Sequence, residues 1–302
     1  MNYSLAQDSR IGVRRSNQDR VAHWRTPEAL LIAVADGLGG HLHGEVAASI
    51  AIELLGAAFQ REAQPKLADP GAFLSRAMGA AHVAILREAE RLRLADTPRT
   101  VLVACVVQGG HAHWTHVGDC RLYLIRQGRV LHRTRDHTVV QQLIDQGRIR
   151  EEAIASHPER NRLLQCIGGY QAPRPEPAAS LRLAKGDVLV LCSDGFWGPL
   201  TQRQMIHALL ARPLEQAIPE LVQLAEHRAG PGCDNVSVLA VTWGEDEVAA
   251  PEMAAADAGQ DLLRTEIRDL SATDLDFQRM SDEDIDKAIA ELKAALRKNA
   301  PQ

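Results

Sequence analysis

Aromatic side chains are scarce in this chain: Phe, Trp and Tyr together make up 4% of its 302 residues. Apolar residues still account for 45% of the sequence, so the core must be mainly aliphatic. No apolar run approaches the length of a membrane span, and the polar start MNYSLAQDSR lacks the apolar stretch of a secretory signal. The five cysteines form no CxxC pair, which favours reduced, buried thiols. These absences predict a soluble, cytoplasmic protein that does not insert into a membrane.

A strongly basic stripe is also absent, although the charge is unevenly distributed. Residues 245–302 carry 15 acidic and 7 basic side chains, whereas residues 1–244 carry 24 and 27. A mildly basic body without interleaved aromatics does not indicate nucleic-acid binding. The change in charge predicts a boundary, with a folded domain over 1–244 and an acidic extension over 245–302 that begins with a linker rich in Ala and acidic residues at 245–258.

The end of the extension has the pattern of an amphipathic helix. Ser281 and Asp284 form a capping-box signature, and the apolar residues that follow fall on one helical face. Those residues are Ile285, Ile289, Leu292 and Leu296. Such a helix either packs on the preceding domain or meets a partner, and our hypothesis is that it is a docking or regulatory segment.

The rest of the chain predicts strands in hairpin-like groups, with the helices in separate blocks. Strands are expected at 30–35, 100–107, 111–117, 121–126, 130–134, 188–192 and 236–241, and before and after the polar segment 12–19. Helices are expected at 44–60, 70–93, 201–211 and 213–228. This order favours an α+β fold with antiparallel sheets flanked by helices over a doubly wound parallel sheet.

The stretch VADGLGGH, residues 34–41, joins an apolar strand to a carboxylate and three glycines. The glycines permit a tight turn and bring backbone carbonyls close to a ligand. Asp36 at the end of a rigid strand is a natural ligand for a hard cation. A turn in which Asp36 caps the next helix is the alternative interpretation of this segment alone.

Five aspartates stand at predicted strand ends. Three follow apolar strands and two precede strands; they are Asp36, Asp119, Asp194, Asp19 and Asp234. In antiparallel sheets the end of one strand lies beside the start of its neighbour, so these carboxylates can gather at one edge. Like charges brought together raise one another's pKa unless cations neutralise them. Ligation by oxygen alone points to Mg²⁺ or Mn²⁺ rather than zinc.

An ordered series of motifs resembles the metal-dependent Ser/Thr protein phosphatases of type 2C, in their bacterial form. The motifs are GVRRSNQD, VADGLGGH, VGDCR, RDHTVVQQLIDQGRI, NRLLQCIGG, VLCSDGFW and CDNVSVLAV, within residues 3–243. The resemblance implies a four-layer αββα sandwich, in which two central antiparallel sheets are flanked by helices. It also implies hydrolysis of phosphoserine and phosphothreonine in proteins by direct attack of a metal-bridging hydroxide, opposing a bacterial Ser/Thr kinase.

The same resemblance implies individual roles. Asp36 bridges two metal ions, the Gly37 carbonyl binds the second ion, and Asp194 and Asp234 hold the first. Asp119 together with Asp194 matches a third, more labile site. Asp19 lies in or next to the metal shell, and Asn235 supports Asp234. Arg14 matches the arginine that binds the substrate phosphate, whereas its neighbour Arg15 is expected to be a solvated surface cation.

Two positions depart from many relatives. Leu38 stands where animal members carry a histidine thought to protonate the leaving group, so a metal-bound water is expected to serve as the acid. Gln18 stands where many relatives have Glu, so looser binding of the second metal is expected. Neither change removes a primary carboxylate.

Other polar clusters have simpler explanations. His111, His113 and His116 form an HxHxxH pattern that could hold zinc, but packed or exposed imidazoles are the expected outcome. Arginines in the variable segment 145–170 could meet an acidic or phosphorylated substrate, and solvated loop charges are the alternative; they are Arg148, Arg150, Arg160 and Arg162. Cys192 and Ser193 have no partner base and no phosphate loop, so we expect core or capping roles rather than a nucleophile.

Two rival functions stay open at this point. A pseudophosphatase would keep the fold and bind phosphoproteins without turnover, but the metal set of Asp36, Asp194 and Asp234 is complete. A two-metal hydrolase of small phosphoesters or nucleotides would turn those over better than phosphoproteins, and we see no base-stacking aromatic residue near the expected site.

Overall fold

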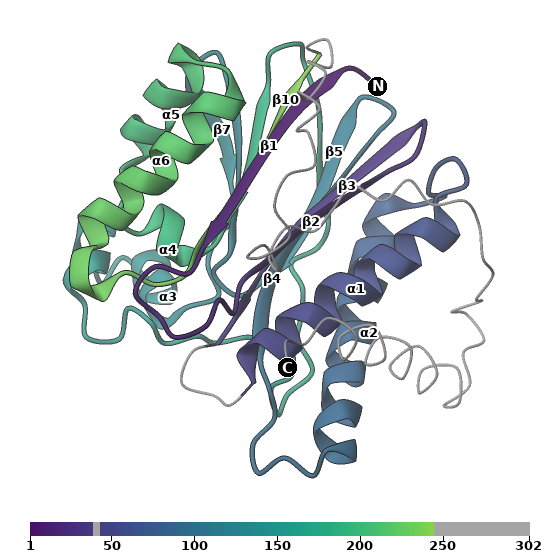
Figure 1. The fold of residues 1–302 in the computed structure, drawn as a ribbon, viewed down its shortest axis with the longest axis vertical. Helices are drawn as coiled ribbons and strands as arrows, with labels where there is room; N and C mark the ends of the chain where they lie inside the picture. Colours follow the sequence, from purple (N-terminus) through teal and green to yellow (C-terminus); the bar gives the residue numbers. More distant parts are fainter. Residues whose placement is uncertain (39–42, 245–302) are drawn as a thin grey trace, which may run out of the picture.

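The computed structural model describes residues 1–38 and 43–244, apart from the side chains of residues 155 and 156. Within these residues, ten strands form two five-stranded antiparallel sheets that lie face to face (Figure 1). The first sheet has the order β1 (Tyr3–Arg10), β10 (Val236–Trp243), β9 (Val188–Cys192), β6 (Arg121–Arg126) and β7 (Arg129–Arg133). The second has the order β2 (Arg20–Arg25), β3 (Ala29–Gly37), β4 (Thr100–Gln108), β5 (His111–Val117) and β8 (Ala179–Arg182).

Helices cover the outer face of each sheet (Figure 1). The helices α1 (Gly44–Glu62) and α2 (Pro70–Arg91) pack on the second sheet, and α4 (Asp194–Trp197), α5 (Gln202–Ala211) and α6 (Leu214–Ala229) pack on the first. The short α3 (Val139–Asp145) and the 3₁₀ turns at Glu151–Ser156 and Gly230–Gly232 complete the elements. None of the helices in the described part of the chain combines the length and apolarity needed to cross a bilayer.

Three apolar clusters explain the layering. One lies between the sheets and includes Leu30, Ile32, Leu122 and Leu239, while the alternate residues of the same strands face the helices. The strands β3 and β4 are therefore buried on both faces, because successive side chains of a strand point to opposite sides. Their near-continuous apolar sequences follow from this double burial.

The predicted α+β, four-layer αββα architecture is confirmed. The strand β8 was not predicted, and its residues alternate between half-buried and exposed at the edge of the second sheet. The one-turn helix α4 was not predicted either. The proposed division at residue 244 stays a prediction, since the linker and the amphipathic helix at 245–302 lie outside the described residues.

Candidate functional site

The five aspartates at strand ends interact with one another at the edge of the sandwich where β3 ends and β2 and β10 begin. Arg20 pairs with Ala35 in the β2–β3 ladder, which places the preceding Asp19 beside Asp36. Asp194 follows β9, and its neighbour Gly195 is so close to Asn235 that an added Cβ would be 2.0 Å from the Asn235 carbonyl oxygen. The antiparallel topology thus gathers side chains that are more than 200 residues apart in sequence.

The carboxyl groups of this cluster perturb one another. Burial, followed by the charges of Asp19, Asp194, Asp119 and Asp234, raises the pKa of Asp36 well above its usual value. Burial and then the charge of Asp234 raise the pKa of Asp194 to about 6, while a hydrogen bond with the Asp36 carboxyl opposes the shift. A cluster that resists ionisation in this way is one that a bound cation would stabilise strongly.

Asp19 has a buried oxygen without a hydrogen-bond partner. Its side chain is 2% exposed; Oδ2 accepts a hydrogen bond of 2.8 Å from Ser193 Oγ, and Oδ1 has no partner among the described residues. Burial raises the pKa of Asp19 to about 7 despite hydrogen bonds from Ser237 and Ser193. An orphaned buried carboxylate oxygen is costly unless a proton or a cation satisfies it.

The donor set therefore suits a hard divalent cation, which prefers carboxylate and carbonyl oxygens. Within residues 1–38 and 43–244, no three acidic, histidine or cysteine side chains already stand at the mutual distances of ligands around one ion. The carboxylates are gathered and electrostatically coupled without forming a closed set of ligands.

Arg14 reaches the cluster from the loop between β1 and β2. Its Nη2 donates to Asp234 Oδ2 over 2.6 Å, with the arginine side chain half exposed. Gly12 permits this approach: its φ is +60°, and an added Cβ would lie 2.2 Å from the Asp234 carbonyl oxygen. Asn235 holds the loop by donating from Nδ2 to the carbonyls of Ile11 and Ser16. The asparagine therefore positions the loop that carries Arg14, in addition to its backbone hydrogen bond with the Asp234 side chain.

Gly37 lies in tight contact with the start of α1. An added Cβ would be 2.4 Å from the Gly44 carbonyl carbon, so no larger residue fits. The Gly37 amide donates to the Gln18 carbonyl over 3.2 Å, and Thr100 Oγ1 donates to the Asp36 carbonyl over 2.7 Å. These contacts fix the backbone on both sides of the Asp36 side chain.

Several supporting residues were missed by the sequence reasoning. Glu45, in the first turn of α1, accepts a hydrogen bond of 3.0 Å from Gln18 Nε2, which adds a further carboxylate near Gly37. Ser193 is fully buried at the N-cap position of α4, which agrees with the predicted core or capping role, and it also orients Asp19. The only sequence signal for Glu45 was an acidic residue at a predicted helix start, a position that favours negative charge in any helix.

A second network supports Asp119. The buried Arg121 donates to both carboxylate oxygens of Asp136 over 2.8 and 2.7 Å, and its guanidinium lies 3.4 Å from the Trp197 ring centroid. Trp197 Nε1 in turn donates to the Asp119 carbonyl over 3.0 Å. This network holds the turn between β5 and β6 against α4.

The histidines of the HxHxxH pattern do not converge. His111 is exposed, while the buried His116 donates from Nε2 to the Arg135 carbonyl over 2.7 Å and stacks on His137. Burial lowers the pKa of His116 to about 4, so its ring is neutral at physiological pH. His116, His132 and His137 are among the residues that line a pocket of about 770 Å³. In the described part of the chain, these imidazoles do not form a group of three that could hold a metal ion.

The remaining candidates lie apart from the carboxylates or are inert. Burial raises the pKa of the Cys192 thiol far above its usual value, which agrees with a core role. Arg162 pairs with Glu159 on the exposed loop before β8.

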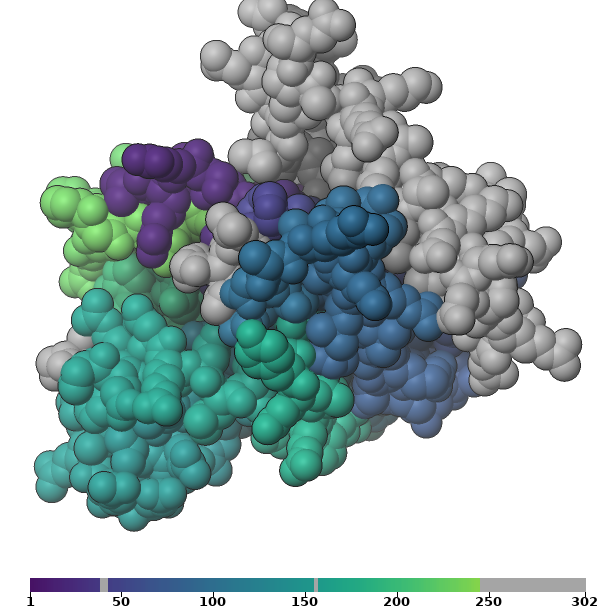
Figure 2. All heavy atoms as spheres, turned by 90° about the horizontal axis from the view of Figure 1, so that it is seen from below, coloured from purple at the N-terminus to yellow at the C-terminus, as the bar shows by residue number. Residues whose placement is uncertain are grey.

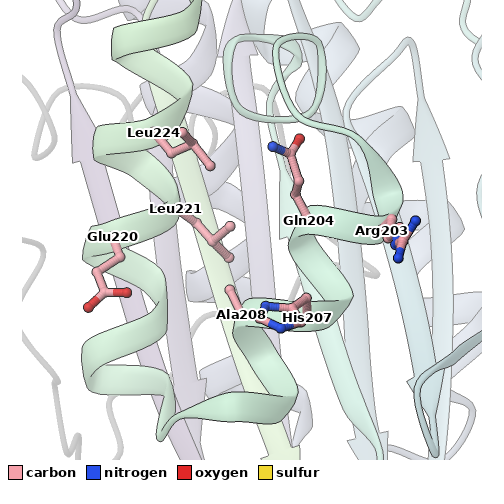
Figure 3. A pocket seen from close by; sticks show the side chains of 7 residues that line it. All are labelled: Arg203, Gln204, His207, Ala208, Glu220, Leu221 and Leu224. Carbon is pink, nitrogen blue, oxygen red and sulfur yellow. The ribbon is translucent and has the colours of Figure 1, made fainter.

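A separate groove of about 350 Å³ lies between α5 and α6, where Leu221 and Leu224 point towards α5 (Figure 3). Its lining contains none of the five aspartates.

Comparison with known proteins agrees with this geometry. The family model described as Protein phosphatase 2C matches residues 6–227. The serine/threonine protein phosphatase PstP of Mycobacterium tuberculosis is 33% identical over 286 residues, covering 88% of this chain and 53% of PstP. The chain therefore spans about half the length of this curated relative.

Solved structures have the same fold over most of the chain. A serine/threonine phosphatase of S. agalactiae is 29% identical with a TM-score of 0.71, covering 80% of this chain and 99% of that one. The catalytic domain of PstP in complex with two manganese ions is 30% identical with a TM-score of 0.67, covering 80% and 98%.

Proposed function

The chain belongs to the protein phosphatase 2C family, and we propose that it hydrolyses phosphoserine and phosphothreonine esters in proteins. The observation that carries the proposal is the meeting of Asp36, Asp194 and Asp234 at one sheet edge, with Arg14 in contact with Asp234. Carboxylates able to hold cations beside a guanidinium able to hold a phosphoryl group are the parts that metal-assisted phosphate-ester hydrolysis needs.

The cofactors we propose are two Mn²⁺ or Mg²⁺ ions, with a third ion in a weaker site. Asp36, the Gly37 carbonyl, Asp194 and Asp234 would hold the two ions, and Asp119 with Asp194 would hold the third. Support comes from the unpartnered Asp19 Oδ1 and the mutual repulsion of the carboxylates, and from the two manganese ions in the PstP catalytic domain. When bound, such ions supply activation of water and neutralisation of phosphoryl charge.

Arg14 has the geometry for phosphate recognition. Its planar guanidinium can donate two parallel hydrogen bonds to phosphoryl oxygens, and half of its side chain is exposed to an incoming substrate. One of these donors, Nη2, is directed towards Asp234. Substrate binding would therefore exchange a carboxylate partner for a phosphate, at a site preorganised by Gly12 and Asn235.

Two residues, Asp19 and Leu38, bear on proton transfer at the site. Without a bound cation, burial raises the pKa of Asp19 to about 7, while Ser193 fixes its Oδ2. A cation at the site would favour the ionised carboxylate. Leu38 provides no titratable group next to Gly37. The chain thus offers no histidine general acid at position 38, and we propose that water at the site protonates the leaving group.

Two rivals remain distinguishable. A pseudophosphatase would bind phosphoproteins without turnover; the complete set of Asp36, Asp194 and Asp234 favours an enzyme. A small-phosphoester hydrolase would prefer free nucleotides. The sequence-based argument against that rival, the lack of a base-stacking aromatic residue near the site, stays a prediction.

The biological setting is also a proposal. We infer that the protein acts in the bacterial cytoplasm on phosphorylated proteins, in opposition to a Ser/Thr kinase. Named bacterial phosphatases among its relatives support the bacterial setting. We propose further that the helix predicted around Ile285 to Leu296 docks a partner, which a version ending at Gly244 would test through activity on phosphoprotein, localisation and oligomeric state.

The test of the main proposal is release of inorganic phosphate from a phosphothreonine peptide. The wild-type protein should require Mn²⁺ or Mg²⁺, and Asp36→Asn and Asp194→Asn should abolish turnover. A protein with native-like thermal unfolding that binds the phosphopeptide without releasing phosphate would instead support the pseudophosphatase. Faster turnover of nucleoside monophosphates than of any phosphopeptide would support the small-phosphoester hydrolase.

A further inference from the structure

Tyr170 is unusual for an aromatic residue in this chain. Among the large apolar side chains in the described residues it is the most exposed, at 89%, in a sequence with only three tyrosines. The Arg99 guanidinium lies 5.0 Å from its ring centroid. A single exposed aromatic residue needs no functional explanation on its own. The position of Tyr170 and the rigidity of its support supply the further argument.

Tyr170 lies next to the edge that carries Asp36. Three residues before it, Ile167 pairs with Thr100 through backbone hydrogen bonds of 3.0 and 2.8 Å. Thr100 is the residue that donates from Oγ1 to the Asp36 carbonyl. The Arg99 carbonyl in turn accepts a 3.0 Å hydrogen bond from the Leu38 amide. Arg99, whose guanidinium lies near the Tyr170 ring, is thus bonded through its backbone to residue 38, two positions after Asp36.

The turn before Tyr170 is held rigidly. Ile167 is fully buried, and the Gly168 amide donates to His82 Nδ1 of α2 over 3.1 Å. Gly168 has a φ of +86°, and an added Cβ would lie 2.2 Å from the Pro98 carbonyl oxygen. On the lower face of the molecule, the blue part of the chain that includes α2 lies beside the teal part (Figure 2).

The cation beneath the ring is also fixed. Arg99 Nη2 donates to Asp96 Oδ1 over 2.9 Å, and the arginine side chain is only 16% exposed. A guanidinium near the ring is attracted to its π-electrons and limits its rotation. The free face of the tyrosine is therefore presented to solvent in a defined orientation before any ligand arrives, which lowers the entropic cost of binding.

We propose that Tyr170, supported by Arg99, is a specificity residue that packs against an apolar side chain flanking the phosphorylated residue of a protein substrate. This inference rests on the proposed function. An open aromatic face suits an apolar or ring-containing peptide side chain, which gains from contact on one side alone. A nucleotide base would also stack on an open aromatic face, so a nucleoside monophosphate is a comparison substrate in the test.

The experiment compares three main substrates, with a nucleoside monophosphate as a fourth for comparison. These are a phosphothreonine peptide with Leu or Pro beside the phosphothreonine, the same peptide with Gly there, and p-nitrophenyl phosphate. Loss of contact with one apolar side chain should lower kcat/KM of Tyr170→Ala by about 5–20-fold on the first peptide, mainly through KM. Activity on p-nitrophenyl phosphate should stay within about twofold, because the phosphoryl-binding groups are unchanged.

Matched variants separate the ring from the fold. Tyr170→Phe should keep the preference for the apolar flank, since it retains the aromatic face. Leu210→Ala removes another exposed apolar side chain, 58% exposed on α5, and should change none of the three activities. The thermal midpoint of Tyr170→Ala should match that of the wild type, because so little of the tyrosine is buried.

Each contrary result has a distinct meaning. If wild-type protein prefers the apolar peptide but Tyr170→Ala keeps that preference, the inference is overturned and the proposed function stands. Equal losses on all three substrates would also overturn it, by indicating a general effect on the site. A larger loss on a nucleoside monophosphate than on the peptide would assign the ring to base stacking. If wild-type protein releases no phosphate from either peptide, the proposed function itself fails.

Discussion

Arg14 Nη2 and Asp234 Oδ2 are 2.6 Å apart, although the two residues are separated by 220 positions in the chain. The contact pairs the candidate phosphate-binding cation with a candidate metal ligand. It also sets the position of the guanidinium in the substrate-free protein.

Replacing Arg14 should therefore impair catalysis much more than stability. We expect Arg14→Ala to lower kcat/KM on a phosphothreonine peptide by roughly 10²-fold, because a preorganised charged donor to the phosphoryl group is lost. Arg14→Lys should recover only part of that loss, since an ammonium cannot donate in a bidentate geometry. Arg15→Ala is the matched control and should stay near wild type. A larger effect of Arg15→Ala would mean that the neighbouring arginine holds the phosphate.

The carboxylate cluster predicts an unusual pH dependence for metal-free protein. The pKa values of Asp19 and Asp194 are about 7 and 6 in the folded protein, above the usual 3.8. The folded state therefore binds more protons than the unfolded state between about pH 4 and 7, and these groups lower stability as pH rises through that window. Below pH 4 both states are protonated, so this destabilisation is absent.

Thermal unfolding in EDTA at pH 5.5, 6.5 and 7.5 measures this effect. Asp19→Asn removes one titrating group at the same size, so the midpoint of the variant should fall less with pH than that of the wild type. Mn²⁺ should raise the wild-type midpoint most at pH 7.5, because the ionised carboxylates repel one another there and a bound cation neutralises them. Parallel pH profiles for the two proteins in EDTA would contradict the prediction.

Much of the architecture was predictable because a strand that is buried on both faces has a nearly continuous apolar sequence. The strand β3 reads as an unbroken apolar run, since its two faces contact the inter-sheet core and α1. The strand β8 has no such apolar run. Its four residues include Ser180 and Arg182, and it exists because β5 provides a pairing edge, which is a tertiary cause.

Some residues of the candidate site were likewise predictable from the sequence, and others were not. Aspartates at strand ends were recognisable because antiparallel topology brings strand ends together. The partners that orient them were not, because a hydroxyl such as Ser193 or a helix-start acid such as Glu45 looks the same whether it caps a turn or contacts a distant residue. The relation of Tyr170 to Asp36 likewise passes through Thr100 and Ile167, and no local pattern encodes that chain of contacts.

Gln18 offers a test of how tightly the second metal ion binds. Its side chain donates to Glu45 Oε2, and its backbone accepts from Gly37. We expect Gln18→Glu to tighten Mn²⁺ binding by about 2–10-fold, since an added carboxylate increases the local negative potential. In EDTA the same variant should unfold at a lower temperature, because two carboxylates then face each other where a hydrogen bond stood.

Isothermal titration with Mn²⁺ and thermal unfolding in EDTA measure the two effects separately. Gln202→Glu, on the exposed start of α5, adds the same charge far from the cluster and is the matched control. Unchanged Mn²⁺ affinity in Gln18→Glu, with a lowered midpoint, would mean that residue 18 only braces α1 against Gly37.

The buried pair of Arg121 and Asp136 should matter for stability as well as for the position of Asp119. Both side chains are at most 6% exposed and share two short hydrogen bonds. Asp136→Asn leaves a buried guanidinium without its counter-charge, which costs about 3–5 kcal/mol in comparable pairs. We therefore expect a clearly lowered urea midpoint for Asp136→Asn. The double variant Arg121→Met with Asp136→Leu should be less destabilised than Asp136→Asn, because it leaves no unpaired buried charge.

Activity measurements separate the effect of the Arg121–Asp136 pair on stability from its effect on the position of Asp119. If the network of Arg121, Trp197 and the Asp119 carbonyl positions Asp119, the double variant should need more Mn²⁺ for half-maximal activity even where its stability is restored. Trp197→Phe keeps the aromatic face over Arg121 but removes the hydrogen bond to the Asp119 carbonyl, so it should raise the Mn²⁺ requirement with a smaller change in the urea midpoint. A Mn²⁺ requirement that stays at the wild-type value in both variants would limit the network to holding α4 against the first sheet.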